Sequence, residues 1–206
     1  MKIICIGRNY RAHIAEMGGL EPAEPVFFIK PSTACLYHGM PLKLAPHLGQ
    51  IDHELELVVS IDGHGRDIPA AMAPGFIASY TLGLDLTARN IQEDLKRMGL
   101  PWEKAKAFDG SAVLGDIELP MAAGTDLQRM AIELRRNGEL VQRGSTSDMI
   151  FSVADLIAYV SRYVSFEPGD LLFTGTPAGV GPIAPGDHLE GYLNGDRLLN
   201  VQVANG

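Results

Sequence analysis

Two glutamates in the stretch "IDHELELVVSI" (residues 51–61) are the first residues of this sequence that could do chemistry. In an extended chain, residues i and i+2 point to the same face, so Glu54 and Glu56 lie side by side, opposite Leu55 and Leu57. A surface strand with its leucines inside would explain the pattern. This stretch alone favours that explanation, and a divalent cation bound between the two carboxylates is the alternative.

Asp85 could supply a third carboxylate to the same site. It ends the apolar stretch "TLGLDL" just before a predicted helix, where an aspartate can also act as the N-terminal cap. Three carboxylates without an obvious histidine or cysteine ligand suit Mg²⁺ or Mn²⁺ better than Zn²⁺. We therefore expect a Mg²⁺ site, which Mn²⁺ could also fill, at Glu54, Glu56 and Asp85.

A histidine and a glutamate in "NYRAHIAEM" (residues 9–17) form a candidate acid–base pair. His13 and Glu16 are three residues apart on a predicted helix, which places them on one face and within hydrogen-bonding reach. A carboxylate that orients an imidazole is the arrangement a general base needs. A solvated helix face without a catalytic role is the alternative.

A lysine beside the cation site could stabilise negative charge that develops during a reaction. The stretch "EKAKAFDG" (residues 103–110) offers Lys104 and Lys106. If this mixed stretch is extended, both lysines point the same way, and the local sequence does not distinguish them.

The loop "TGTPAGVG" (residues 174–181) could bind an anion through backbone N–H groups and the hydroxyls of Thr174 and Thr176. It lacks the Gly-Lys-Ser/Thr ending of a P-loop, and no convincing helix follows it. We therefore predict a tight, rigid turn and no nucleotide-binding loop.

The elements that position these residues are mostly short strands separated by glycine and proline turns. Two Asn-Gly pairs predict β-hairpins, and Ser152 with Asp155 is spaced like a helix capping box. The pattern indicates an α+β chain dominated by β-structure, with a few inserted helices. Strands are expected over 1–7, 25–30, 54–61, 76–86 and 170–173, hairpins over 132–142 and 189–203, and helices over 9–17, 87–98 and 152–163, with Ile91, Leu95 and Met98 as the apolar stripe of the second helix.

Length and charge narrow the class of protein. A chain of 206 residues is long enough for one domain with a substantial core, and we predict a single domain over 1–206. The 17 basic and 25 acidic residues give a net charge of −8, which argues against nucleic acid or an anionic membrane as partner. Cys5 and Cys35 are expected to be buried free thiols, and without a signal peptide or membrane span we expect a cytoplasmic protein.

Taken together, these stretches resemble the fumarylacetoacetate hydrolase family, and the resemblance runs nearly from end to end. The sequence is most similar to the short branch that includes acylpyruvases and fumarylpyruvate hydrolases. The stretches that carry the resemblance, in the order of the family, are "IGRNYRAHIAEMG", "EPVFFIKPSTA", "DHELELVV", "LDLTARNIQ", "GLPWEKAKAFDG", "GSTSDMIFSVADLIAYVS" and "PGDLLFTGTPAGVGP".

The resemblance implies a mixed β-sandwich roll, usually dimeric, with a mobile N-terminal lid helix over about residues 9–20. It implies Mg²⁺ or Mn²⁺ at the three carboxylates and selects Lys106 as the active-site lysine. The residues that it implies are His13 and Glu16 as the catalytic pair on the lid, and Arg8, Gln92, Thr174, Gly175 and Thr176 as substrate-binding residues.

The main activity that the resemblance implies is metal-dependent hydrolysis of a carbon–carbon bond in an acylpyruvate-type 2,4-dioxo acid, such as fumarylpyruvate. The products are pyruvate and a carboxylic acid. Oxaloacetate decarboxylation or tautomerisation, or isomerisation of a dienoic diacid in aromatic degradation, is the alternative. A metal-binding domain without turnover is the alternative from another class. Longer family members carry an N-terminal domain that this sequence lacks, so we do not expect fumarylacetoacetate itself as substrate.

Overall fold

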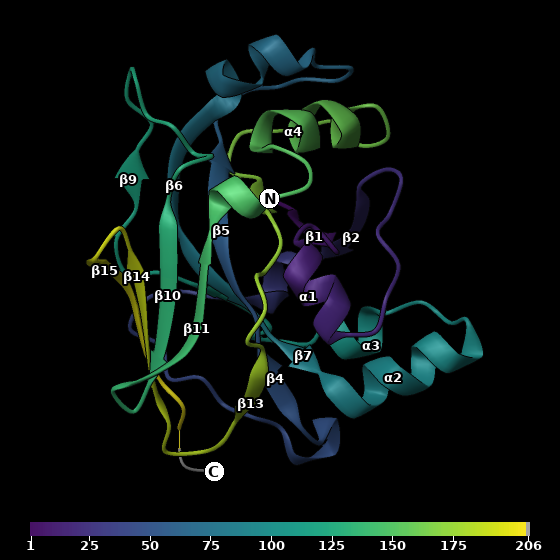
Figure 1. Ribbon diagram of the computed structural model, residues 1–206, viewed down its shortest axis with the longest axis vertical. Helices are drawn as coiled ribbons and strands as arrows, with labels where there is room; N and C mark the ends of the chain where they lie inside the picture. The colour runs from purple at the N-terminus through teal and green to yellow at the C-terminus, as the bar shows by residue number, and fades with distance from the viewer. Residues whose placement is uncertain (205–206) are drawn as a thin grey trace.

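The largest sheet of the protein supports most of the candidate residues (Figure 1). The computed structural model describes residues 1–204. The β1–β12 and β3–β8 pairs are parallel and the other pairs are antiparallel, so this sheet is mixed. In spatial order its strands are β2 (Val26–Lys30), β1 (Ile3–Gly7), β12 (Leu171–Phe173), β5 (Leu55–Ile61), β6 (Ile77–Asp85), β8 (Ala112–Leu114) and β3 (Cys35–Leu36), with β9 (Leu119–Pro120) paired to β6.

A four-stranded antiparallel sheet packs against the large one, and a three-stranded sheet lies beside them. Both predicted hairpins are confirmed, because Asn137-Gly138 and Asn194-Gly195 all take positive φ, as tight hairpin turns require. The four-stranded sheet has the order β11 (Glu139–Ser145), β10 (Ala131–Arg136), β14 (His188–Leu193) and β15 (Asp196–Gln202), and the other has β13 (Gly181–Ile183), β4 (Ile51–His53) and β7 (Thr87–Ala88).

The main core fills the space between the two larger sheets. Alternation along β5 sends Leu55, Leu57 and Val59 into this core, and Val58 into a second, smaller cluster on the other face of the sheet. All four side chains are fully buried, and each buried side chain of this size contributes about 1.5–3 kcal/mol. The predicted strand-rich α+β fold, a mixed β-sandwich roll, is confirmed.

Within residues 1–204, four α-helices and four 3₁₀ segments lie around the sheets. The predicted capping box is confirmed, since Ser152 and Asp155 bond each other's backbone N–H at the start of α4. The second helix ends at Gly99, which takes the left-handed conformation typical of a helix C-terminus. The α-helices are α1 (Arg11–Glu16), α2 (Arg89–Met98), α3 (Glu103–Lys106) and α4 (Val153–Ser161), and the 3₁₀ segments are η1 (Ser32–Ala34), η2 (Pro46–Leu48), η3 (Ala70–Phe76) and η4 (Thr146–Asp148).

Two local predictions were wrong in detail. The strand expected over 54–61 begins only at Leu55, and Glu54 lies between β4 and β5. The stretch at 103–110, whose conformation the sequence left open, begins with a helical turn, so Lys104 and Lys106 point in different directions. In α2, Met98 is 58% exposed, and the buried positions are Arg89, Gln92 and Leu95, because this helix covers a polar site as well as the core.

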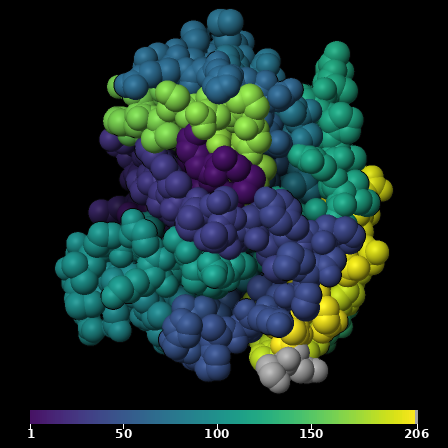
Figure 2. All heavy atoms as spheres, turned by 180° about the vertical axis from the view of Figure 1, so that it is seen from behind, coloured from purple at the N-terminus to yellow at the C-terminus, as the bar shows by residue number. Residues whose placement is uncertain are grey.

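On the far side of the molecule the segment after β2 crosses the middle (Figure 2, indigo), α4 lies above it (light green), and α2 projects at one edge (teal). Both cysteines are free thiols, as predicted, but only Cys5 is fully buried and Cys35 is partly accessible. Within residues 1–204 none of the helices combines the length and the apolar character needed to span a bilayer.

Candidate active site

Three buried carboxylates meet where β5, β6 and the β4–β5 connection come together. Each of Glu54, Glu56 and Asp85 offers one oxygen, and these oxygens lie within 4.8 Å of one another. None of the three residues is more than 5% exposed. The surface-strand explanation of the two glutamates is therefore wrong, and Asp85 at the end of β6 is no helix cap, because α2 begins four residues later.

One oxygen of each carboxylate is held by a group other than Lys106. Glu54 Oε1 accepts hydrogen bonds from Thr87 Oγ1 at 3.0 Å and from Arg89 Nη2 at 2.8 Å. Glu56 Oε2 accepts one from the Gly175 backbone N–H at 2.7 Å. Asp85 Oδ1 forms an ion pair with Lys30 Nζ at 2.7 Å. The protein thereby fixes the direction in which each second oxygen points.

Lys106 spans two of those second oxygens. Its Nζ donates to Glu54 Oε2 and to Asp85 Oδ2, each at 2.8 Å, and the residue is 3% exposed. Burial disfavours the ammonium form, but the charges of Asp85 and Glu54 outweigh burial and raise the pKa of Lys106. Lys106 is therefore a permanent cation and not a proton acceptor.

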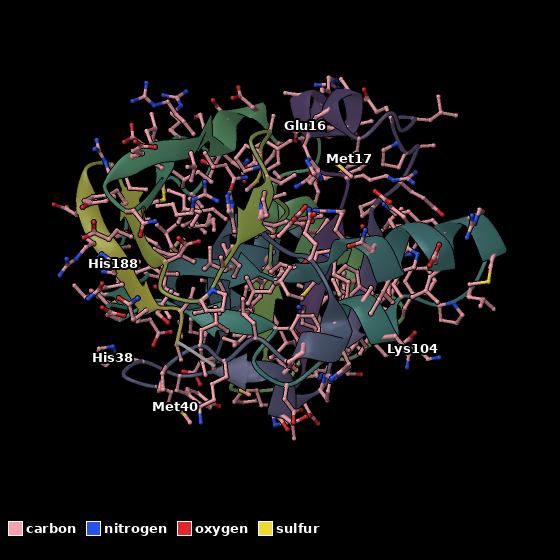
Figure 3. All side chains as sticks on the ribbon, turned by 90° about the horizontal axis from the view of Figure 1, so that it is seen from below. Glu16, Met17, His38, Met40, Lys104 and His188 are labelled. Atoms are coloured by element: carbon pink, nitrogen blue, oxygen red, sulfur yellow. The ribbon has the colours of Figure 1, made fainter. Side chains whose placement is uncertain are left out.

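Lys104 differs from Lys106 in the direction of its side chain and in its exposure to solvent. Residues i and i+2 of a helix lie about 200° apart around the axis, so α3 turns one lysine inward and the other outward. Lys104 is exposed and points away from the protein (Figure 3). The structure thus distinguishes two lysines that the local sequence could not.

The donor set fits a divalent cation. Burial, and then the like charges of Asp85 and Glu54, raise the pKa of Glu56 well above its usual range, and a bound cation would favour its ionised form. The oxygen-only ligands are of the kind that Mg²⁺ and Mn²⁺ prefer. Around the site, the buried carboxylates of Asp52, Glu54, Glu56 and Asp85 outnumber the buried cations of Lys30, Arg89 and Lys106.

We expect Glu56 to make the metal-free protein less stable as the pH rises. The pKa of Glu56 is 4.5 when unperturbed and higher in the folded state, so its protonated form stabilises the fold fully below pH 4.5. That contribution is lost as the pH rises through the folded-state pKa. A bound cation favours the ionised carboxylate, so Mn²⁺ should raise Tm more at pH 8 than at pH 5. At 100 times its Kd, Mn²⁺ should raise Tm by about 5–10 °C.

Differential scanning fluorimetry with and without Mn²⁺ from pH 5 to 8 measures both effects. The matched control is Glu56→Gln, which should flatten the pH dependence of the metal-free protein and reduce the response to Mn²⁺. A Tm that responds equally to Mn²⁺ in Glu56→Gln and in the parent protein would contradict the assignment of Glu56 as a ligand.

The predicted His13–Glu16 pair is present on α1. His13 Nδ1 lies 3.2 Å from Glu16 Oε2, and the His13 side chain is 12% exposed. The other carboxylate oxygen of Glu16 accepts a hydrogen bond from the Gly179 backbone N–H at 3.0 Å. Glu16 therefore orients the imidazole and also joins α1 to the loop that follows β12.

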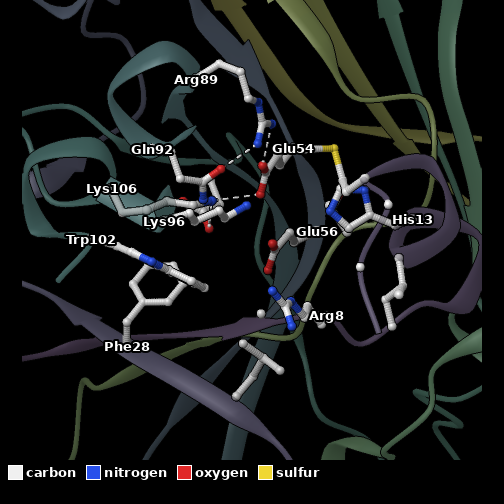
Figure 4. Close-up of a pocket in the computed structure, with 18 residues that line it drawn as sticks. Arg8, His13, Phe28, Glu54, Glu56, Arg89, Gln92, Lys96, Trp102 and Lys106 are labelled. Atoms are coloured by element: carbon white, nitrogen blue, oxygen red, sulfur yellow. Dashed lines mark hydrogen bonds and ion pairs between the residues drawn. The ribbon is translucent and has the colours of Figure 1, made fainter. Parts of the chain in front are cut away.

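One cavity of about 270 Å³ contains the carboxylates, Lys106 and His13 (Figure 4). Of the predicted substrate-binding residues, it is lined by Arg8, Gln92 and Thr176. Gln92 Oε1 accepts a hydrogen bond from Arg89 at 2.8 Å, which turns the amide NH₂ group away from the arginine. The cavity thus combines groups that could bind an anion, polarise a carbonyl and transfer a proton.

Thr174 and Gly175 do not line this cavity, which corrects their predicted role. The Thr174 hydroxyl is buried and donates to the Leu57 carbonyl at 2.8 Å. Gly175 takes φ of 99°, and a Cβ there would lie 2.8 Å from Asn9 Cβ, so glycine is required. The Gly175 N–H donates to Glu56 Oε2, so these two residues support β5, the strand that carries the predicted metal ligand Glu56.

Sequence reasoning missed several residues that support the site. Lys30 is fully buried on β2 and contacts Asp85, and Arg89 bonds Asp52, Glu54 and Gln92. Arg89 and Gln92 are three apart at the start of a helix, so the spacing could have suggested a shared face.

Gln142 on β11 was also missed, and its local sequence contains no indication of its role. It is buried, accepts from Leu55 N at 3.0 Å and donates to Thr176 Oγ1 at 2.6 Å and to the Pro177 carbonyl at 2.8 Å. It thereby connects the ligand strand to the loop over 174–177.

The fold and the site define a strand-rich α+β protein with a buried carboxylate cluster that could bind a divalent metal, beside a lysine and a histidine–glutamate pair. Residues 2–203 match the family described as fumarylacetoacetate (FAA) hydrolase C-terminal. The chain belongs to the fumarylacetoacetate hydrolase family.

Among its relatives, "Oxaloacetate tautomerase FAHD1, mitochondrial" of Mus musculus is 44% identical over 201 residues, covering 98% of this chain and 90% of the relative. "Oxaloacetate tautomerase YcgM" of Escherichia coli is 44% identical over 198 residues, covering 96% of this chain and 90% of the relative. A crystal structure of fumarylpyruvate hydrolase from Pseudomonas aeruginosa in complex with Mn²⁺ and pyruvate is 38% identical, with a TM-score of 0.93, covering 100% of this chain and 90% of the other. The two relatives are named for oxaloacetate tautomerisation, and the solved structure is named for fumarylpyruvate hydrolysis.

Proposed function

We propose that this protein is a divalent-metal-dependent enzyme that interconverts the keto and enol forms of oxaloacetate. The observation that carries the proposal is the single cavity in which a permanent cation, Lys106, and a histidine oriented by a carboxylate, His13, face the same three buried carboxylates. The names of the mouse and bacterial relatives support the choice of substrate.

Tautomerisation moves one proton between C3 and the oxygen on C2. His13, with Nδ1 oriented by Glu16, uses Nε2 to remove a proton from C3 of the keto form. The electron pair of the broken C–H bond forms the C2–C3 double bond, and negative charge develops on the C2 oxygen. Return of the proton from the His13 imidazolium to that oxygen gives the enol and restores neutral His13, and the reverse steps regenerate the ketone.

The remaining groups bind the substrate and stabilise charge. Glu54, Glu56 and Asp85 would bind the cation, which when present supplies a Lewis acid that polarises the 2-oxo group. Lys106 stabilises the developing enolate by its fixed charge. Gln92 donates its amide NH₂ to a substrate oxygen, and Arg8 binds a carboxylate at the mouth.

Hydrolysis of acylpyruvates is the second candidate. It is supported by the resemblance to the Pseudomonas aeruginosa fumarylpyruvate hydrolase and by the same histidine, which could activate a water molecule for attack on the 4-carbonyl. Cleavage would release pyruvate enolate, so Lys106 would stabilise the same kind of charge. The two reactions differ in what His13 deprotonates.

A direct comparison of substrates tests the proposal. The enol of oxaloacetate absorbs in the ultraviolet, so its decay above the uncatalysed rate measures tautomerisation, and pyruvate release from acetylpyruvate or fumarylpyruvate measures hydrolysis. We expect oxaloacetate tautomerisation to have the higher kcat/KM, to disappear in EDTA, and to return with Mg²⁺ or Mn²⁺. Pyruvate release from either acylpyruvate at a higher kcat/KM would refute the proposal in favour of the second candidate.

A further inference from the structure

Two cationic side chains at the mouth of the cavity have no acidic partner. Arg8 and Lys96 both line the cavity (Figure 4), and within residues 1–204 neither forms an ion pair. The cations deeper in the cavity differ, because Arg89 pairs with Asp52 and Glu54, and Lys106 pairs with Glu54 and Asp85. The mouth therefore carries positive charge that the protein itself does not neutralise.

The position of Lys96 is set by its helix and by one aromatic ring. Lys96 follows Gln92 by four residues on α2, so both side chains lie on the face that meets the cavity. Its Nζ lies 5.6 Å from the centroid of the Trp102 ring, a favourable cation–π distance. Glu93, three residues earlier on the same helix, forms no ion pair with Lys96 in the described part of the chain, and Asp94 bonds Arg97.

The electrostatic surroundings of Lys96 favour an added anion. Partial burial, and then the positive charge of Arg89, lower the pKa of Lys96; Glu54 opposes this shift, and Arg8 and Lys106 add to it. Arg8 faces the same cavity from a left-handed backbone conformation, with φ of 61°, which is strained for a residue other than glycine. A carboxylate bound between the two side chains would offset their mutual repulsion.

We propose that Lys96 is a specificity-determining residue that, together with Arg8, binds the second carboxylate of a dicarboxylic substrate. The proposal rests on the proposed function for the other end of the substrate, the 2-oxo acid group directed at Glu54, Glu56 and Asp85. A diacid reaches both the carboxylate cluster and the mouth, whereas a monoacid leaves the mouth unoccupied. The site should accordingly select 2-oxo diacids over 2-oxo monoacids.

Malate and lactate test this without turnover, because these 2-hydroxy acids differ only in the second carboxylate. Their Kd values are measured by isothermal titration in the presence of Mn²⁺. We expect the parent protein to bind malate more tightly than lactate, and Lys96→Met to reduce that preference about 5–50-fold, the scale for losing a charged hydrogen bond at a partly exposed site. Lys96→Arg should retain the preference, and Lys104→Met is the matched surface control.

Kinetic measurements separate this proposal from the proposed function. Lys96→Met should raise KM for oxaloacetate. For acetylpyruvate, a monoacid, it should leave both kcat and KM unchanged. An unchanged preference for malate in Lys96→Met overturns the role of Lys96 even if the protein tautomerises oxaloacetate. A preference that depends on Lys96 in a protein that does not act on oxaloacetate supports the carboxylate site and refutes the proposed function.

Discussion

Replacement of Lys106 by methionine is expected to lower kcat for oxaloacetate tautomerisation by about 10²–10³-fold, the usual loss when one preorganised charge-stabilising donor is removed. Lys106 Nζ is buried, permanently charged and 2.8 Å from two of the three predicted ligand carboxylates. In the proposed reaction the 2-oxo group would bind beside these carboxylates, and the ammonium group would then stabilise the negative charge that develops on the C2 oxygen. Initial rates at saturating substrate and Mg²⁺ measure the effect.

Lys106→Met has a second expected consequence, for cation binding. Lys106 bonds the oxygens of Glu54 and Asp85 that face the cavity, and a cation bound to these carboxylates would compete with it. Removing the ammonium group should therefore leave Mn²⁺ affinity unchanged or increase it while turnover falls. A variant that loses Mn²⁺ affinity and activity together would show that Lys106 acts by supporting the metal ligands rather than by stabilising the enolate.

Lys104→Met is the matched control for Lys106→Met. It removes an equal charge two residues away, from an exposed side chain that points out of the protein. Its kcat and KM should stay within about twofold of the parent protein, as surface substitutions usually do. A large loss in Lys104→Met with full activity in Lys106→Met would show that the wrong lysine has been assigned.

The lysine assignment shows how far the sequence alone could lead. Alternation indicated that Glu54 and Glu56 share a face, and this information is local. The choice between Lys104 and Lys106 needed either the family resemblance or the helical turn at 103–106. Short stretches of mixed polarity do not distinguish a single helical turn from an extended segment, because too few residues contribute to the pattern.

Supporting residues were harder to predict because their partners are distant in the sequence. Gln142 bonds Leu55, which lies 87 positions away, and Lys30 bonds Ser111 across 81 positions. Neither a glutamine in a hairpin nor a lysine at the end of an apolar strand indicates burial by itself, since both residue types are usually exposed. Only the packing of β2, β8 and β11 around the site gives these side chains their partners.

Hairpin turns and helix caps, by contrast, were predictable, because residues close together in the sequence determine them. Asn137-Gly138 and Asn194-Gly195 take the positive φ that tight hairpin turns need, and Ser152 with Asp155 closes a capping box within one helical turn. These features were predicted with their residues because every contact that defines them lies within a few positions. The β-sandwich roll that contains these features could be predicted only from the ordered series of family motifs.

Substitution of His13 should separate proton transfer from decarboxylation. His13→Gln is expected to lower kcat for tautomerisation, and for any acylpyruvate hydrolysis, by about 10²–10⁴-fold, the usual share of general acid–base catalysis. Loss of CO₂ from oxaloacetate needs no base, only groups that accept the charge of the enolate, so decarboxylation should fall much less. The three rates are measured on one preparation with Mg²⁺ present.

Glu16 allows a sharper version of the same test, because its two carboxylate oxygens contact different partners. Glu16→Gln retains an amide oxygen that can accept the Gly179 N–H, and it removes the negative charge beside His13 Nδ1. If α1 serves mainly as a lid over the cavity, this variant should behave like the parent protein, whereas Glu16→Ala should raise KM for every substrate alike. If Glu16 serves to orient and charge-stabilise the imidazole, both variants should lower kcat for tautomerisation and leave decarboxylation nearly unchanged. Equal losses of kcat in all three reactions would show that His13 and Glu16 do not form the base, and a rise in KM alone would assign them to closure of the cavity.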